Sequence, residues 1–505
     1  MLNTVRSSLK NSIVYGLGNV AVKLIGFLLI PLYTDPKFFS VDDFGFIGLL
    51  DISGLVLIAF LGSSLPQSLN RWYWDKDHLG KQKTVFFMTL LMQILISVSF
   101  CLLLMPLARN FSAIILHTPD YGHIINLVII SAGLQAVNTI ISTLMRLQSK
   151  SVLYTVTNLV KLVVVLTLTI YLIVFRKMGV EGIYLAQVIG NIFFIVILLG
   201  YTFKNITVSF DRALAKAMLI FGLPLLLANI SGVALNVIDR YSLNSMDLMK
   251  YVALYTLAFK ISSVLKLVIV DSIKMAVTPM IIQKINAPDN MRFYSKILLY
   301  SSFVLMLGII SVSLFSFELI KVMAKSNQYW EAYIIIPILC LSVFFVNLKD
   351  ISTNGLFIVK KTRILGSIVF IASTLSLFLN LIFIPLWGIV GAAMATLTAQ
   401  LLYWLITYFY SQKEFHIPYE IRKIIIILVV GGILSCAGLV INDLSLALRI
   451  IIKSACIVSF PFLLALFNFY EPAELQAIKG FVVKWSDLKR IGDNIRSFKA
   501  IKDDI

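Results

Sequence analysis

The sequence predicts an all-α integral membrane protein with about fourteen transmembrane helices. The chain has 505 residues and is 59% hydrophobic, with a mean hydropathy of +0.93, whereas soluble domains are about 45–50% apolar even when Gly is counted. Apolar runs of about twenty residues recur from end to end, and each is long enough to cross a bilayer core of roughly 30 Å. Basic residues gather in alternate loops, which is typical of membrane proteins with positively charged cytoplasmic loops.

Fourteen apolar segments are interpreted as spans. They run 9–33, 44–69, 84–107, 121–145, 152–175, 181–203, 213–238, 249–278, 294–317, 332–358, 364–384, 388–410, 424–441 and 447–469. With the N-terminus inside, the cytoplasmic loops hold more than twice as many Lys and Arg as the outer loops, so both termini are predicted to be cytoplasmic. No cleavable signal is expected, because the first ten residues lead directly into a span without a cleavage pattern.

The remaining composition excludes several classes of site. All four cysteines lie within apolar runs, so neither disulfides nor a metal centre is expected. The net charge of +18 is distributed over alternate loops, which favours membrane topology over nucleic-acid binding. Residues 471–505 carry hydrophobic side chains at three- and four-residue spacing among charges, which predicts an amphipathic helix on the anionic inner leaflet. A plain solubilising tail is the alternative interpretation.

An internal repeat divides the chain. The phrase "GVEGIYLAQ" begins at Gly179 and "GIVGAAMAT" at Gly388, an offset of 209, while "YGLGNV" from Tyr15 and "FGLPLL" from Phe221 are offset by 206. The repeat unit holds six spans, and parallel repeats are a transporter architecture with the ligand site between the lobes. The predicted divisions are an N-terminal lobe 1–208, a C-terminal lobe 209–412, two further helices in 413–470 and the cytoplasmic tail 471–505.

Ionisable residues inside the predicted spans are candidates for a polar site. A charge at the bilayer centre costs about 2.5–3.5 kcal/mol on insertion scales, so such residues normally face a partner or a watery cavity. Those within spans are Lys23, Asp51, Lys161, Lys260, Lys266, Asp271, Lys274, Lys349 and Asp350, and Asp239 and Arg240 end the seventh span.

Alternatives remain for individual charges. Lys23 is expected to line a cavity, but a buried salt bridge would serve Lys161 equally well. Lys274 and Lys349 lie near enough to span ends to extend their ammonium groups to the interface. Asp239 and Arg240 are equally interpreted as interfacial residues.

Helical geometry predicts which of these charges share a face. At 100° per residue, Lys260, Asp271 and Lys274 lie on one face of their helix, and Lys260 requires a partner from elsewhere. Adjacent residues point apart on a helix, so Lys349 and Asp350 are predicted not to neutralise each other. The balance of the intramembrane charges is cationic, which favours an anionic ligand such as a phosphate or an acidic sugar.

Several phrases resemble those of a known family. "SIVYGLGNVAVKLIGFLLIPLYT" with "DDFG", "DRYSL" with "KYVALYTLAFKI", and "NLIFIPLWGIVGAAMAT" are similar to segments of Wzx-type O-antigen flippases. These belong to the multidrug, oligosaccharidyl-lipid and polysaccharide exporter superfamily. The resemblance covers residues 8–470 in order, without a large insertion.

The resemblance implies two six-helix lobes in a V around a central cavity, with two further helices. It implies a flippase of lipopolysaccharide biosynthesis in the bacterial inner membrane. That flippase moves undecaprenyl-pyrophosphate-linked oligosaccharide to the outer leaflet. Coupling to a cation gradient is implied with the ion, H⁺ or Na⁺, left open, as is a polysaccharide polymerase partner; no cofactor is expected.

The resemblance also sorts the charged residues. It favours Lys23, Asp51, Arg240, Lys260 and Lys266 as cavity-lining residues that meet the substrate, and places Asp239 and Arg240 at the outer mouth. Lys161 and Lys349 remain candidates for substrate binding on their intramembrane charge alone. The candidates for a gate or for ion coupling are Asp239, Asp271, Lys274 and Asp350.

Three other functions were weighed. A multidrug cation antiporter of the same superfamily would call for a carboxylate in the first lobe, where Asp51 is the main candidate. A peptidoglycan-precursor flippase would share the span count and the cationic cavity. A membrane enzyme acting on the same lipid-linked sugar is disfavoured, because the loops are too short for a catalytic domain and no Gly-rich phosphate loop follows a strand.

Overall fold

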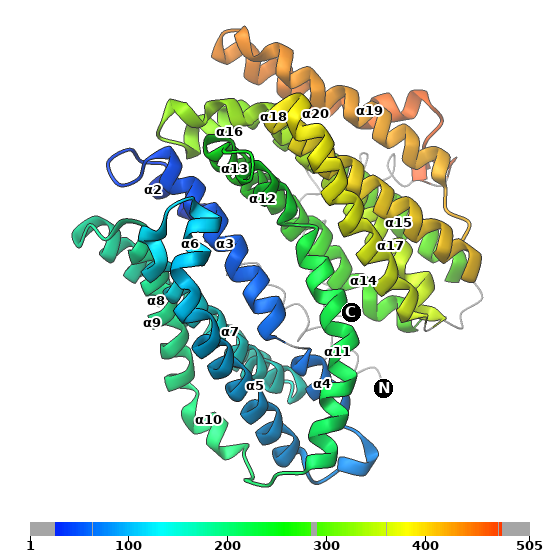
Figure 1. The fold of residues 1–505 in the computed structure, drawn as a ribbon. Helices are drawn as coiled ribbons and strands as arrows, with labels where there is room; N and C mark the ends of the chain where they lie inside the picture. The colour runs from blue at the N-terminus through cyan, green and yellow to red at the C-terminus, as the bar shows by residue number, and fades with distance from the viewer. Residues whose placement is uncertain (1–25, 63, 284–289, 360, 473, 477–505) are drawn as a thin grey trace, which may run out of the picture.

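The computed structural model describes residues 26–476, apart from residues 63, 284–289, 360 and 473. Every regular element in this part of the chain is helical, which confirms the predicted all-α class (Figure 1). Most of the first predicted span, the candidate Lys23 and nearly all of the predicted amphipathic tail lie outside the described residues.

The helices follow the predicted spans closely. The α-helices are α2 (Ile30–Tyr33), α3 (Val41–Leu61), α4 (Leu65–Trp72), α5 (Gln82–Leu104), α6 (Ala108–Leu116), α7 (Gly122–Leu147), α8 (Ser151–Ile170), α9 (Gly179–Ile197), α10 (Leu199–Lys204), α11 (Arg212–Ala234), α12 (Ile238–Asn244), α13 (Met249–Leu265), α14 (Asp271–Gln283), α15 (Asn290–Leu314), α16 (Ser316–Met323), α17 (Ile336–Ile358), α18 (Thr362–Glu414), α19 (Ile421–Val440) and α20 (Leu446–Leu466). Shorter 3₁₀ or π segments are η1 (Lys76–His78), η2 (Met105–Leu107), η3 (Pro119–Tyr121), η4 (Tyr171–Phe175), η5 (Lys266–Val270), η6 (Asn327–Ile334) and η7 (Ile441–Asp443).

Twelve helices within the described residues are long and apolar enough to cross a membrane, so the chain is a multi-pass membrane protein. One of them, α18, has 53 residues, and a straight helix of that length would extend about 80 Å. The backbone at Gly388 is non-helical (φ 56°, ψ −128°). A Cβ on Gly391 would lie 2.0 Å from the carbonyl oxygen of Phe383, eight residues earlier. The chain therefore folds back at Gly388, and α18 comprises the two spans predicted at 364–384 and 388–410. The total of fourteen spans stays a prediction.

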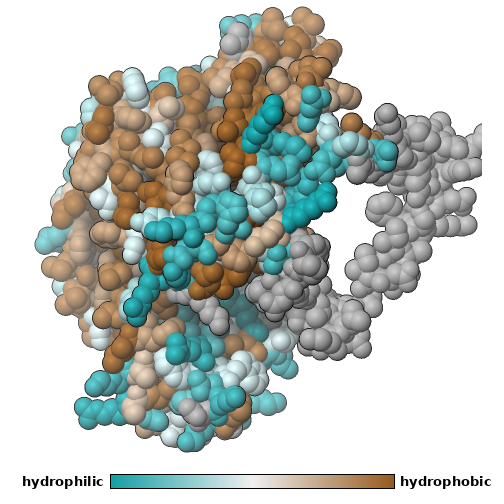
Figure 2. Space-filling view, turned by 90° about the vertical axis from the view of Figure 1, so that its right-hand side faces the viewer, coloured by the Kyte–Doolittle hydropathy of each residue, from teal (hydrophilic) through white to brown (hydrophobic). Residues whose placement is uncertain are grey.

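The exterior is apolar, as a bilayer requires. Large hydrophobic side chains are strongly exposed on several helices, for example Leu102 (71%), Phe175 (72%) and Phe462 (70%). Broad hydrophobic areas on one face are interrupted by a hydrophilic band and end in a hydrophilic region below (Figure 2). The hydrophobic effect therefore cannot by itself drive these helices together in lipid, and polar contacts and close packing between helices become important.

Two groups of helices face each other (Figure 1). Helices α3 and α5–α9 form one group and α13–α18 the other, with α11 between them. The first half of α11 packs on α4, where the Ser68 hydroxyl donates to the Met218 carbonyl at 3.0 Å and the rings of Trp72 and Phe221 meet edge to face at 5.3 Å. Helix α11 thus connects the groups, and the predicted lobe division at residue 209 stays a prediction.

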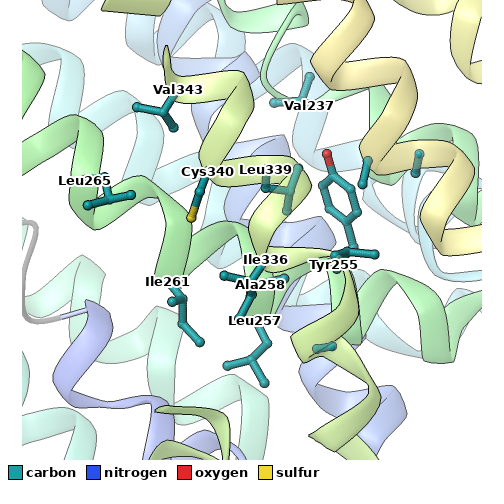
Figure 3. Packing of buried hydrophobic residues seen from close by; sticks show 14 of the residues in the cluster. Val237, Tyr255, Leu257, Ala258, Ile261, Leu265, Ile336, Leu339, Cys340 and Val343 are labelled. Carbon is teal, nitrogen blue, oxygen red and sulfur yellow. The ribbon is translucent and has the colours of Figure 1, made fainter. Parts of the chain in front are cut away.

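Apolar packing against α17 anchors helix α13. Leu257, Ala258 and Ile261 lie against Ile336 and Cys340 of α17 (Figure 3). All five side chains are buried. The Tyr255 hydroxyl, on the same helix, lies 2.9 Å from the Thr396 hydroxyl of α18. This packing fixes α13, so that Lys260 is held on the side that faces α3.

The last two helices attach to the second group. Gly431 and Gly438 of α19 lie directly against Met306 and Leu314 of α15. Helix α20 is joined to α16 by a buried ion pair, since Lys453 Nζ lies 2.8 Å from Glu318 Oε2.

Candidate functional site

A cavity of about 650 Å³ lies between the two groups of helices. It is lined by side chains from α3, α7 and α9 on one side and from α11, α12, α13 and η5 on the other. Most of the residues that line the cavity are apolar, but several polar side chains also line it. Its charged lining residues are Asp51, Arg240, Lys260, Lys266 and Asp271.

Arg240 is presented to the cavity by a break in the chain. Helix α11 ends at Ala234 and α12 begins at Ile238, so the side chain can turn inward from a short helix. Its side chain is only 7% exposed, and its guanidinium carbon lies 4.4 Å from the ring centroid of Phe259. One Nη donates to the Asn236 carbonyl at 2.7 Å, while the buried Nε has no hydrogen-bond partner among the described residues. This Nε is enclosed and lies near the Asp239 carboxylate, so the guanidinium can meet a ligand in the cavity only through its Nη groups.

Asp239 lies behind Arg240 and faces away from the cavity lining. Its carboxylate accepts from the Arg240 backbone N–H at 2.9 Å and from the Thr396 hydroxyl of α18 at 3.4 Å. The distance from Arg240 Nε to the Asp239 carboxylate is 3.8 Å, so the pair is electrostatic without a good hydrogen bond. Asp239 therefore balances the charge of the buried guanidinium without a direct hydrogen bond to it.

Lys260 and Asp51 form an ion pair across the cavity. Lys260 Nζ on α13 lies 3.3 Å from Asp51 Oδ2 on α3, and the Tyr184 hydroxyl of α9 donates to Asp51 Oδ1 at 3.2 Å. The rings of Tyr33 and Phe44 also lie near the Lys260 ammonium, at 5.7 Å. The partner that Lys260 required from another helix is thus Asp51.

The cavity continues along a π-helical segment. Residues 266–270 form η5 between α13 and α14, and π turns within α-helices frequently occur at functional sites. Lys266 and Asp271, at the two ends of this turn, both line the cavity. Lys274 instead pairs with Asp350 of α17 at 3.5 Å. Neither of these two lines the cavity.

Lys161, for which the sequence left a cavity position and a buried salt bridge equally open, lies between two neighbouring helices. It is absent from the cavity lining and donates to Gln135 Oε1 at 2.7 Å and Asn191 Oδ1 at 2.6 Å. The Phe194 ring centroid lies 5.4 Å from its Nζ. Its ammonium points between α7 and α9, where amide oxygens replace the carboxylate that a salt bridge would supply. The polar residues Gln135 and Asn191, one on each neighbouring helix, were the signal that sequence reasoning passed over.

Lys349 and Asp350 require a correction. The Lys349 ammonium contacts the Asp350 carboxylate directly, although the two residues are adjacent on α17. The prediction that they point apart holds for the Cβ atoms, but four methylene groups allow the lysine to reach round the helix. Lys349 also lies over the Tyr403 ring at 4.9 Å and does not line the cavity.

The charges that line the cavity have a positive balance. Within the described residues they comprise three cations and two carboxylates, and Asp51 is engaged by Lys260. An anion would therefore find donors at Arg240 with little repulsion. Whether any of these residues contacts substrate stays a prediction.

Contacts between the two groups close one end of the molecule, which is the predicted outer end. The Thr34 hydroxyl donates to the Met323 carbonyl at 3.3 Å, and Lys325 Nζ donates to the Asp35 carboxylate at 2.7 Å. The hydrogen bond from Lys325 holds the pKa of Asp35 below its ordinary value, against the opposing effect of burial. The sequence did not indicate this contact, because it joins loops 290 residues apart.

Comparison with protein families identifies the chain. Residues 8–285, more than half of the sequence, match the family described as polysaccharide biosynthesis protein. The chain belongs to this family. Over 136 residues it is 26% identical to an uncharacterised membrane protein of Methanocaldococcus jannaschii, and it spans only 27% of that protein's length.

Solved structures show the same fold. The lipid II flippase MurJ in an inward closed conformation has a TM-score of 0.70 at 15% identity, over 89% of this chain and 98% of that one. A multidrug resistance MATE family transporter of the MOP superfamily matches in its inward-facing form with a TM-score of 0.64 at 12% identity, over 81% and 97% of the two chains. Its outward-facing form gives 0.61 at 14% identity, over 81% and 95%. The fold is therefore MurJ- and MATE-like.

Proposed function

We propose that this protein is a flippase, and not an enzyme, that moves undecaprenyl-pyrophosphate-linked oligosaccharide repeat units across the bacterial inner membrane by alternating access. The observation that carries this proposal is Arg240, a largely buried arginine whose side chain lines a cavity between two groups of helices. Guanidinium groups match phosphate oxygens in geometry and charge. The family's link to polysaccharide biosynthesis supports a lipid-linked sugar as the substrate.

The finer points of the proposal follow the sequence resemblance. The repeat unit is proposed to be that of an O-antigen, made for lipopolysaccharide, and a polysaccharide polymerase is the proposed partner. Both termini are placed in the cytoplasm by the charge asymmetry of the loops. The movement is proposed to be coupled to a gradient of H⁺ or Na⁺.

A peptidoglycan-precursor flippase is the second candidate. The likeness to the lipid II flippase favours it, because that structure covers 89% of this chain. Both candidates carry a polyprenyl pyrophosphate, so the cationic cavity serves either. They differ in the sugar, which must be tested directly.

The test is transbilayer movement in liposomes that contain the purified protein. Undecaprenyl-pyrophosphate oligosaccharide is placed in the membrane, and an impermeant lectin reports the fraction on the outer leaflet over time. Protein-dependent movement of this lipid, faster than that of lipid II, supports the proposal. The reverse preference supports the second candidate.

A third outcome would reject both. If neither lipid moved, while a cationic dye was expelled under a proton or sodium gradient, the protein would be a multidrug antiporter. Asp51, the cavity-lining carboxylate of the first group of helices, would then be its cation-binding group.

A further inference from the structure

Asp51 is an unexpected residue in a cavity proposed to bind anions. Its carboxylate is 34% exposed and its partner Lys260 is 22% exposed, so water reaches both groups. The two residues come from opposite groups of helices, Asp51 from α3 and Lys260 from α13. The ion pair therefore links the two sides of the cavity at its wall.

The ion pair between Asp51 and Lys260 is weak enough for a stronger anion to replace Asp51 as the partner of Lys260. Partly exposed ion pairs are worth only about 0–1 kcal/mol, and a pyrophosphate group, which carries two charges over its two phosphates, attracts an ammonium more strongly than a carboxylate does. The Tyr184 hydroxyl also donates to Asp51, at 3.2 Å, from the same side of the cavity as α3. Asp51 thus keeps a hydrogen-bond donor when Lys260 turns to another anion.

We propose that Asp51 is an internal counter-ion of Lys260 that the phosphate of the substrate displaces. This inference rests on the proposed function. In the empty cavity the Asp51 carboxylate lies beside the Lys260 ammonium, where the phosphate of the substrate would otherwise bind. A bound phosphate takes Lys260, leaves Asp51 to Tyr184, and so breaks one link between α3 and α13. Asp51 then sets a threshold, since only an anion strong enough to displace it engages Lys260.

Binding of inorganic pyrophosphate to the purified full-length protein tests this inference. Asp51→Asn removes the competing charge, and we expect it to tighten pyrophosphate binding up to about fivefold, the equivalent of one exposed ion pair. Lys260→Gln should weaken binding. Asp51→Ser is a second neutral variant in which the same tightening is expected, should Asp51→Asn fail to fold.

Glu331→Gln is the matched control. Glu331 of η6 pairs with Lys250, which lies on α13 as Lys260 does. The distance is 3.3 Å, as in the pair of Asp51 and Lys260, but this pair is exposed and lies away from the cavity lining. Glu331→Gln changes the net charge of the protein by the same amount as Asp51→Asn, and we expect it to leave pyrophosphate binding unchanged.

The outcomes separate this inference from the proposed function. If the wild type binds pyrophosphate and Lys260→Gln weakens binding, but the Asp51 variants bind no more tightly, the counter-ion role is wrong and the anion cavity stands. Equal tightening in Glu331→Gln would also overturn the role, because net charge alone would explain it. If no variant binds pyrophosphate, the anion cavity itself fails, and the proposed function with it.

Discussion

The side-chain contacts in the cavity explain why Asp and Arg stand together at the end of the seventh predicted span. Asp239 has its carboxylate on the Arg240 backbone and on α18, and Arg240 turns its guanidinium to the cavity over Phe259. The two neighbours have different roles. Asp239 holds α12 against α18, and Arg240 extends its guanidinium to the cavity. Of the two interpretations that the sequence left open, an interfacial pair and a pair at the mouth of the cavity, the interfacial one does not fit, because both side chains are buried.

Lys161 gives a prediction at the residue scale. Lys161→Met has a similar shape but leaves Gln135 Oε1 without its donor, whereas Asn191 Oδ1 keeps its hydrogen bond from Asn138. An unsatisfied buried acceptor costs about 1–3 kcal/mol. We expect a lower melting temperature in detergent, with pyrophosphate binding unaffected because the residue lies outside the cavity. An unchanged melting temperature would show that the ammonium is not a structural donor.

Single residues also show where sequence reasoning ended. The intramembrane position of Asp51, Lys260, Lys266 and Asp271 was visible from charge in apolar runs, and all four line the cavity. Their partners were not visible, because pairing depends on which helices meet. Lys453 and Glu318, which join α20 to α16, were missed, since each lies close enough to a predicted span end to read as interfacial.

At the scale of elements, the two repeated phrases adopt the same local structure. Gly179 and Gly388, which are 209 residues apart and begin the two phrases, both have positive φ, at 57° and 56°. Three residues later, Gly182 and Gly391 both approach the end of the preceding helix closely. Each phrase therefore encodes a tight turn between two spans, and a glycine is required where φ is positive.

The turn in α18 makes a testable prediction. A Cβ on Gly391 would lie 2.0 Å from the Phe383 carbonyl oxygen, and forced overpacking typically costs about 1–3 kcal/mol. Gly391→Ala should therefore lower the melting temperature clearly. Gly432→Ala on α19 is the control, because nothing lies within 4 Å of its Cβ position. Equal melting temperatures for the two variants would contradict the folded-back description of α18.

Element boundaries were largely predictable, and the reason is physical. A bilayer imposes one length and one polarity on every span, so hydropathy locates helices well. What hydropathy does not register is a change within a span. The π turn at residues 266–270 and the break between α11 and α12 carry no loss of hydrophobicity, yet they position Lys266 and Arg240.

At the scale of the whole molecule, contacts between loops 290 residues apart close the predicted outer end. The ion pair between Asp35 and Lys325 is formed only while the carboxyl is ionised. Because the pKa of Asp35 is lowered from 3.8 in this closed state, the pair stabilises closure above that value and is lost as the pH falls through the lowered one.

Closure should therefore be constant across neutral pH. We expect the closed fraction, measured from the distance between spin labels attached on either side of this contact, to stay level between about pH 5 and 8 and to fall below about pH 4. Lys325→Ala should lower the closed fraction at neutral pH to the level that the wild type shows below about pH 4, and so abolish that dependence. If the closed fraction instead changed with a midpoint near neutral pH, a titratable group other than Asp35 would control closure.

The most direct test of the central claim is the rate at which undecaprenyl-pyrophosphate oligosaccharide crosses liposomes that contain wild-type protein or Arg240→Gln. Loss of one charge-assisted contact, about 1.5–3 kcal/mol, predicts movement slower by about tenfold or more. Because Arg240→Gln also leaves the buried Asp239 carboxylate without its counter-charge, the melting temperature should fall, and the rates are compared at a temperature at which both proteins remain folded. Arg109→Gln, an exposed arginine outside the cavity, should move the lipid at the wild-type rate. Equal rates for wild type and Arg240→Gln at matched protein content would contradict the account.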